Sequence, residues 1–188
     1  MPRLPASFCV AVLCLVLAAC ATTALETNKD AANLKTLEKV YVVANTGNVK
    51  LLGSTSPSLG EYLSSTVTAR LSKRSVDAKG VQLGGMDLNL TQDNLEKDIA
   101  AYGATQVMSI ELTGGTVEPY TNVLHSGDIV VTIFDVRINK AVWKAKIHVQ
   151  AFSGWGVPEA TMGDSVDKVF TAMQADGLLL QAAPSTGS

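Results

Sequence analysis

The chain has 188 residues, with 15 basic and 17 acidic side chains and a formal net charge of −2. This charge balance lacks the basic excess of a nucleic-acid-binding protein, so we expect no nucleic acid partner. The length is sufficient for one domain with its own core, and no fixed-period repeat indicates a solenoid or a propeller.

The first 19 residues are typical of a secretory signal. Arg3 supplies a positive charge, residues 8–17 form an unbroken apolar run, and the small residues Ala18 and Ala19 stand directly before Cys20. This tripartite order is the mark of a signal peptide. The run of about ten apolar residues is far shorter than the roughly 20 that a membrane-spanning helix needs. The segment therefore predicts export and not a transmembrane anchor.

Leu17-Ala18-Ala19-Cys20 resembles the lipobox of bacterial lipoproteins, in which the cysteine sulfur receives a diacylglyceryl group and the chain is cut just before it. The alternative is a plain secretory signal that leaves Cys20 as an ordinary thiol. Cys9 and Cys14 lie within the signal, so Cys20 would be the one cysteine of the mature chain. Because an exposed unpaired thiol forms mixed disulfides in an oxidising periplasm, the cysteine count favours lipidation.

Lipidation at Cys20 implies practically permanent anchoring, since two or three acyl chains bury many methylene groups. Position 21 is Ala and not the Asp that resembles an inner-membrane retention signal, which favours the periplasmic face of the outer membrane. Residues 20–36 are expected to form the lipidated amino terminus and a flexible tether with a reach of roughly 20 to 25 Å. The domain is expected over residues 37–182, followed by a disordered tail at 183–188.

The first half of the domain reads as alternating strands and helices. Lys39–Asn45 is a β-branched apolar run and predicts a buried first strand. Ser56 as N-cap and Pro57 at the first helical position predict the start of a helix. Its apolar stripe recurs every four residues and consists of Leu59, Leu63, Val67 and Leu71.

A short strand is predicted at 81–83, and Thr91 is expected to cap a second helix that ends at Gly103. The expected buried face of this helix consists of Leu95, Ile99 and Tyr102. Residues 105–112 predict a third strand, with Met108, Ile110 and Leu112 on one face.

The pattern then changes to two long strands, 128–138 and 141–152, joined by the two-residue turn Asn139-Lys140. A last helix is expected from Asp164 or Ser165, with inward-facing residues Val166, Val169, Phe170, Met173 and Leu180. The predicted fold class is therefore mixed α/β in the order β-α-β-α-β-β-β-α. Its sheet is parallel at first and antiparallel after Leu112, with helices packed against it.

The hairpin sequence IFDVRINKAVWKAKIHV, residues 133–149, resembles that of a broad group of periplasmic lipoproteins and envelope proteins. The group includes the TolB amino-terminal domain, the penicillin-binding-protein activator LpoB, the curli secretion lipoprotein CsgG and a lipoprotein family of unknown function. Asp135, Lys140 and Trp143 occupy the matching places, whereas Ile138-Asn139 stands where many members have a glycine. The resemblance implies an α/β envelope protein that acts by binding, and through CsgG it also implies self-assembly.

Two pairs of residues are candidates for chemistry. Asp135 and Trp143 could hold a ligand across the hairpin, but a structural role is favoured, with Asp135 fixing the turn and Trp143 filling the core. His125 near Asp128 suggests a base oriented by a carboxylate. Ser126 adjoins His125 without the G-x-S-x-G setting of an activated nucleophile, so an ordinary loop histidine is favoured.

Two further residues are candidates for partner contact. His148 lies on the wet face of its strand, where an ordinary exposed residue is the alternative. Trp155, flanked by glycines in FSGWGVPEA, is a candidate interface residue, and folding back onto its own domain is the alternative. The pairs at 84–85 and 114–115 match no phosphate-binding glycine pattern and are expected to form turns or bulges.

No cofactor is expected, and no H-x-x-x-H or C-x-x-C spacing indicates a metal site. These patterns favour a lipid-anchored, non-catalytic accessory factor in envelope assembly or maintenance, whose partners are the membrane and an envelope protein. One alternative is a hydrolase of cell-wall or lipid substrates that uses the region of His125 and Asp128. The other is a subunit of a secretion or self-assembling complex, which would make the protein an oligomer.

Overall fold

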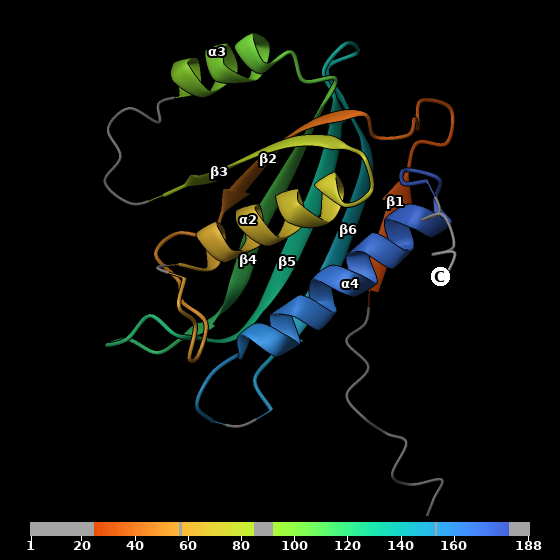
Figure 1. The fold of residues 1–188 in the computed structure, drawn as a ribbon. Helices are drawn as coiled ribbons and strands as arrows, with labels where there is room; N and C mark the ends of the chain where they lie inside the picture. Colours follow the sequence, from red (N-terminus) through yellow and green to blue (C-terminus); the bar gives the residue numbers. More distant parts are fainter. Residues whose placement is uncertain (1–24, 57, 85–91, 153, 181–188) are drawn as a thin grey trace, which may run out of the picture.

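A computed structural model describes residues 25–56, 58–84, 92–152 and 154–180, which form a six-stranded sheet and three helices (Figure 1). The strands lie side by side in the order β1-β6-β5-β4-β2-β3. In chain order the elements are β1 (Leu25–Lys29), β2 (Lys39–Asn45), α2 (Leu59–Ser72), β3 (Asp77–Leu83), α3 (Gln92–Tyr102), β4 (Gln106–Val117), β5 (Leu124–Asp135), β6 (Lys140–Gln150) and α4 (Glu159–Ala175).

The sheet is mixed, and its parallel part comes first in the chain. Strand β2 pairs in parallel with both β3 and β4, whereas β4, β5, β6 and β1 pair antiparallel in turn. This confirms the predicted mixed α/β fold class and its change from parallel to antiparallel after the third predicted strand. The observed order begins with an additional strand, β1, at the far edge of the sheet.

The two faces of the sheet are covered differently. Helices α2 and α4 lie across one face (Figure 1), toward which β2 turns the fully buried side chains of Val40 and Val42. Because successive strand residues point to opposite faces, Tyr41 lies on the other face, where its ring packs edge-on against Tyr102 of α3. The core therefore lies between the sheet and the helices α2 and α4.

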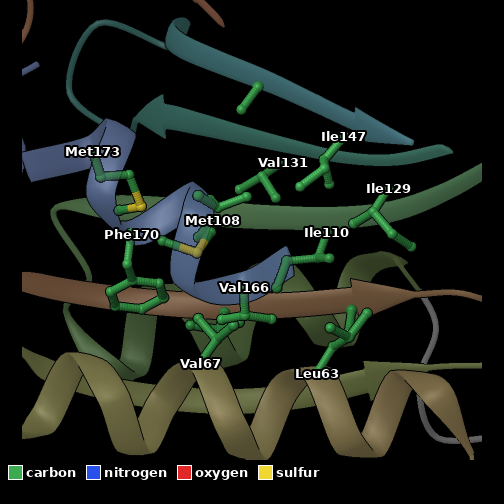
Figure 2. Close-up of a cluster of buried hydrophobic side chains, with 14 of the residues drawn as sticks. Leu63, Val67, Met108, Ile110, Ile129, Val131, Ile147, Val166, Phe170 and Met173 are labelled. Carbon is green, nitrogen blue, oxygen red and sulfur yellow. The ribbon is translucent and has the colours of Figure 1, made fainter. Parts of the chain in front are cut away.

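Figure 2 shows this core, where apolar side chains of both helices meet those of the central strands. The stripe predicted for the first helix is fully confirmed, since Leu59, Leu63, Val67 and Leu71 are each at most 4 % exposed. Each such side chain contributes roughly 1.5–3 kcal/mol when removed from water. The strands contribute, among others, Met108, Ile110, Ile129, Val131 and Ile147.

Helix α2 begins later than the sequence suggests. Its N-cap is Ser58, whose extended backbone lets the side-chain oxygen accept from the Glu61 backbone N–H at 3.1 Å. The predicted cap, Ser56, is therefore wrong, and its backbone N–H donates instead to Ser54 Oγ at 3.0 Å. A serine at either place fits the capping pattern, and only the backbone conformation distinguishes them.

Strand β3 and helix α3 also differ from expectation. The strand starts at Asp77 and not at residue 81, because 77–80 pair in parallel with 39–42 of β2. Helix α3 leaves its predicted buried residues Leu95, Ile99 and Tyr102 only half-buried. The helix is attached to the sheet largely by polar contacts from Asp98 and Tyr102, and it lies on the face opposite α2 and α4.

Helix α4 begins at Glu159, five residues before the predicted start, and Pro158 precedes it in an extended conformation. Val166, Val169, Phe170 and Met173 face inward as predicted. Leu180 does not, because Gly177 at φ +84° ends the helix and redirects the chain. As a result Leu178 and Leu179 are buried and Leu180 is 70 % exposed.

The β5–β6 connection is longer than the predicted two-residue turn. Strand β5 ends at Asp135 and β6 begins at Lys140, which pair with one another and leave four residues between them. The Asp135 carboxylate accepts from the Arg137 backbone N–H at 2.9 Å, and Asn139 adopts φ +49°. An aspartate accepting from the residue two places on is a turn-forming contact, which explains the wider turn.

The predicted flexible tether is wrong from residue 25 onward. Leu25–Lys29 forms β1, which pairs antiparallel with β6 from Leu25 opposite Ile147 to Lys29 opposite Trp143. The following segment is also attached, because the Leu37 backbone N–H donates to the Leu178 carbonyl at 2.8 Å. Most side chains of this edge strand are exposed, so its sequence carries no apolar pattern.

Some of the predictions concern residues outside the described ranges. They are the signal at 1–19, the lipidated Cys20, the positions of Pro57 and of the Thr91 cap, and the tail at 183–188. These remain predictions. Among the helices that the structure describes, none is long and apolar enough to span a membrane.

Candidate functional site

Asp135 and Trp143 do not form a shared site. Asp135 is 2 % exposed and accepts from the Arg137 side chain, with Nη2 to Oδ2 at 2.6 Å. The hydrogen bond from the Arg137 guanidinium lowers the pKa of the Asp135 carboxyl. Together with the backbone contact of Arg137, this arrangement fixes the turn, which is the structural role favoured for Asp135.

Trp143 is 1 % exposed and fills the core, and its indole Nε1 donates to Asp176 Oδ2 at 2.8 Å. Asp176 also accepts from Lys29 Nζ at 2.5 Å. The Lys29 bond, followed by the Trp143 bond, lowers the pKa of Asp176. Because Asp176 follows α4, one carboxylate joins strands β1 and β6 to the end of that helix. No pattern in the sequence predicts this link.

His125 and Asp128 have different partners. His125 Nε2 lies 3.8 Å from Glu118 Oε2. Asp128 Oδ1 lies 2.7 Å from His148 Nδ1, and Asp128 Oδ2 lies 3.0 Å from Lys146 Nζ. These contacts, first His148 and then Lys146, lower the pKa of Asp128. The structure thus pairs Asp128 with His148 across β5 and β6, not with His125.

Trp155 is exposed and does not fold back onto the core. Its side chain is 78 % exposed, and Phe152 before it is fully exposed. Two apolar side chains on other loops are also exposed, Tyr120 at 94 % after β4 and Leu52 at 36 % after β2. We call the end of the sheet that carries Leu52, Tyr120, Phe152 and Trp155 the loop end, since these residues lie on the connections after β2, β4 and β6.

Backbone hydrogen bonds hold these loops together. The Leu52 N–H donates to Val157 O at 2.9 Å, and the Val157 N–H donates to Leu124 O at 2.6 Å. Lys50 exchanges two further bonds of 2.8 and 2.9 Å with the segment that enters β5. Figure 1 shows the three connections at the same end of the sheet, opposite the β5–β6 turn. The loops that carry the exposed side chains are therefore fixed to one another by their backbones.

Gly156 illustrates how closely the loops approach. It has φ +119°, and a Cβ there would clash with the side chain of Val123 and lie 3.2 Å from the Leu124 carbonyl oxygen. Only glycine fits without strain. The glycines beside Trp155, read from the sequence as a loop signal, thus include one that allows the chain to pack against the start of β5.

The opposite face carries a groove of about 930 Å³ beside α3, lined by apolar side chains that include Leu95, Val107 and Phe134. Beneath α3, Tyr41 Oη donates to Asp98 Oδ2 at 2.9 Å, and Lys79 Nζ lies 3.1 Å from the same oxygen. Burial, together with the hydrogen bond to Asp98, raises the pKa of Tyr41 to about 12. These contacts hold the helix in place and leave the groove open.

Metal ligands are not grouped in the described part of the chain, where no three His, Cys, Asp or Glu side chains come together. The glycines at 114–115 lie at a register irregularity between β4 and β5, which confirms the predicted bulge at that place. Of the predicted partner-contact residues, Trp155 is presented on a surface and His148 is held by Asp128. Phe152, predicted to end the last strand, lies exposed in the loop after β6.

The mixed α/β fold of this chain is similar to that of other proteins whose structures have been solved. A PelC variant from Paraburkholderia phytofirmans, solved as a dodecamer, matches with a TM-score of 0.52 and 16 % identity, over 80 % of this chain and 98 % of that chain. A second PelC dodecamer structure from the same organism matches at 0.50 and 15 %, over 81 % and 98 %. At these identities the likeness concerns the fold.

The LpoB C-terminal domain of Salmonella enterica matches at a TM-score of 0.42 and 17 % identity, over 63 % of this chain and 87 % of that chain. No protein-family model matches the sequence. A search of curated proteins also finds no match.

Proposed function

We propose that this protein is a lipid-anchored periplasmic protein of the outer membrane that acts by binding, as an accessory factor in envelope assembly or maintenance. The observation that carries the proposal is the sequence Leu17-Ala18-Ala19-Cys20 at the end of a short apolar run, five residues before strand β1 begins. An anchor at Cys20 confines the domain to a thin layer. Confinement raises its effective concentration for a partner in that layer without new contacts.

The contacts of the conspicuous polar residues support binding over hydrolysis. Asp135 stabilises a turn, Asp176 joins β1 and β6 to the end of α4, and Asp128 bridges two strands through His148 and Lys146. Each carboxylate thus has a structural partner. The hydrolase alternative needs His125 and Asp128 in one site, whereas each of them contacts another residue.

A second candidate function is that of a subunit in an assembly of many copies. The specific observation is that the similar PelC structures are dodecamers and that the likeness extends over 98 % of the PelC chain. An assembly of many copies would present many anchors to one membrane and would multiply the strength of attachment. Native mass spectrometry of the detergent-purified protein tests this candidate, and a purely monomeric spectrum at micromolar concentration contradicts it.

The anchor is tested by Cys20→Ser in the full chain, with Cys14→Ser as the matched control inside the predicted signal. We expect Cys20→Ser to move the protein from the membrane fraction to the soluble periplasmic fraction and Cys14→Ser to leave it in the membrane. Mass spectrometry of the mature wild-type amino terminus should find a diacylglyceryl-modified cysteine. An unmodified amino terminus refutes the anchor.

A further inference from the structure

Strand β1 leaves only a short connection to the proposed anchor. Leu25 is the first residue of β1, five residues after Cys20, and a fully extended chain spans at most about 3.3–3.6 Å per residue. A lipid attached at Cys20 is therefore held within roughly 18 Å of Leu25. The connection is much shorter than the tether of residues 20–36 that the sequence suggested.

The direction of β1 decides which end of the domain this connection can reach. Leu25 pairs with Ile147, three residues before Gln150, so the last residue of β6 on the side of the loop end lies about 10 Å away along the strand. The β5–β6 turn lies the other way, beyond Lys140, at a distance of seven residues or about 23 Å. Because β1 is antiparallel to β6, Leu25 is the residue of β1 nearest the loop end, and the strand runs from there toward the β5–β6 turn.

The loop end carries the side chains that a bilayer surface accommodates. Phe152 and Trp155 follow β6, the strand to which β1 is paired, and both are largely exposed. Tyr120 is exposed on the adjacent loop. Tryptophan and tyrosine rings are favoured at the membrane interface, where the apolar ring is buried and the polar group remains hydrated.

We propose that the loop end rests on the phospholipid bilayer, with Trp155, Phe152 and Tyr120 in its interfacial layer, so that the domain has a fixed orientation on the membrane. The inference rests on the proposed anchor at Cys20 and adds to it a second contact and a defined face. The sheet then stands with its β5–β6 turn pointing away from the membrane. The groove beside α3 remains accessible to partners from the side.

The chain contains its own reporter for this contact. It has two tryptophans, and Trp143 is 1 % exposed whereas Trp155 is 78 % exposed. Purified lipidated full-length protein is reconstituted into vesicles of phosphatidylethanolamine and phosphatidylglycerol, with and without brominated acyl chains. We expect the Trp155 emission to shift to shorter wavelength in vesicles and to lose most of its intensity with brominated lipid. In Trp155→Phe the remaining Trp143 signal should change little.

A tryptophan moved to the other end is the matched control. Ile138 lies in the β5–β6 turn and is 47 % exposed, so Ile138→Trp in the Trp155→Phe background places an indole far from the expected bilayer. This indole should stay unquenched by brominated lipid and accessible to iodide in solution. Equal quenching of the two positions overturns the proposed orientation.

Flotation of the same vesicles separates failure of this inference from failure of the anchor. Protein that does not float with the vesicles refutes the anchor. Protein that floats while Trp155 remains open to iodide refutes only the bilayer contact of the loop end. A shift of Trp155 emission that depends on protein concentration and occurs without vesicles identifies a second copy of the chain as the occupant and also overturns the inference.

Discussion

Replacing Asp176 by Ala should detach β1 and β6 from the end of α4. The carboxylate accepts from the buried Trp143 indole at 2.8 Å and from Lys29 at 2.5 Å. Leaving the indole N–H buried without an acceptor costs about 1–3 kcal/mol. The Lys29 side chain is nearly half exposed, so the lost ion pair adds at most about 1 kcal/mol.

The expected loss for Asp176→Ala is therefore about 1–4 kcal/mol, or roughly 2–16 °C in Tm for a domain of this size. Asp176→Asn is the matched variant, because its amide oxygen can still accept from the indole. It should lose about 1 kcal/mol or less, since only the charge is removed. Urea unfolding followed by circular dichroism measures both free energies of unfolding.

The comparison between the two variants tests the reasoning directly. Equal losses for Asp176→Ala and Asp176→Asn would show that the indole bond contributes nothing. A double-mutant cycle with Trp143→Phe should give a coupling energy of about 1 kcal/mol, the ordinary net contribution of a hydrogen bond. A coupling energy of zero would refute the link between Trp143 and Asp176.

The same carboxylate should contribute to the pH dependence of stability. Its bonds with Lys29 and Trp143 lower the pKa of Asp176 in the folded protein. The stabilisation is therefore complete above the unfolded pKa of about 3.9 and is lost as the pH falls through the lower folded pKa. The difference in stability between wild type and Asp176→Asn should be full at neutral pH and should vanish in acid. A difference that stays constant into strong acid would contradict this.

Two further substitution pairs test the corrected element boundaries. Ser58→Ala should lower the free energy of unfolding by about 1 kcal/mol, because the α2 cap is lost. Ser56→Ala should change it by less than about 0.5 kcal/mol. The reverse order of the two losses in thermal unfolding would identify Ser56 as the cap. Leu179→Ala should cost about 2–4 kcal/mol and Leu180→Ala less than about 0.5 kcal/mol in urea titrations, because the first side chain is 3 % and the second 70 % exposed. Similar losses would place both leucines in the core.

The central elements could be predicted because their side chains repeat with the period of the backbone. Lys39–Asn45 is continuous and apolar because it is covered on both faces, and its bounds are those predicted. The stripe of α2 has the spacing that puts its residues on one side of a helix. The spacing of Val166 and Phe170 likewise predicts the inward face of α4, although it does not predict the residue at which the helix begins.

Features that depend on distant partners could not be predicted in the same way. Strand β1 has a mostly exposed surface, and only its pairing with β6 makes it a strand. The wider turn after Asp135 shifts the register of β5 against β6. The predicted two-residue turn would not place Asp128 opposite His148, so the sequence did not predict their contact. In the loop end, the flanking glycines predict that Trp155 lies on a loop. No comparable sequence pattern marks Tyr120 and Phe152, whose place at the loop end depends on how the loops pack together.

Strand β1 also has a consequence for the order in which the domain is completed. Its partners in β6 follow it by more than 110 residues, and Lys29 bonds to Asp176 across 147 residues of chain. Contacts between such distant segments form slowly, because a long loop must close before they contribute. A polypeptide that emerges with its amino end first must therefore keep this edge segment unpaired until residues 140–150 have appeared, so that β1 can join the sheet only after its other five strands have been made.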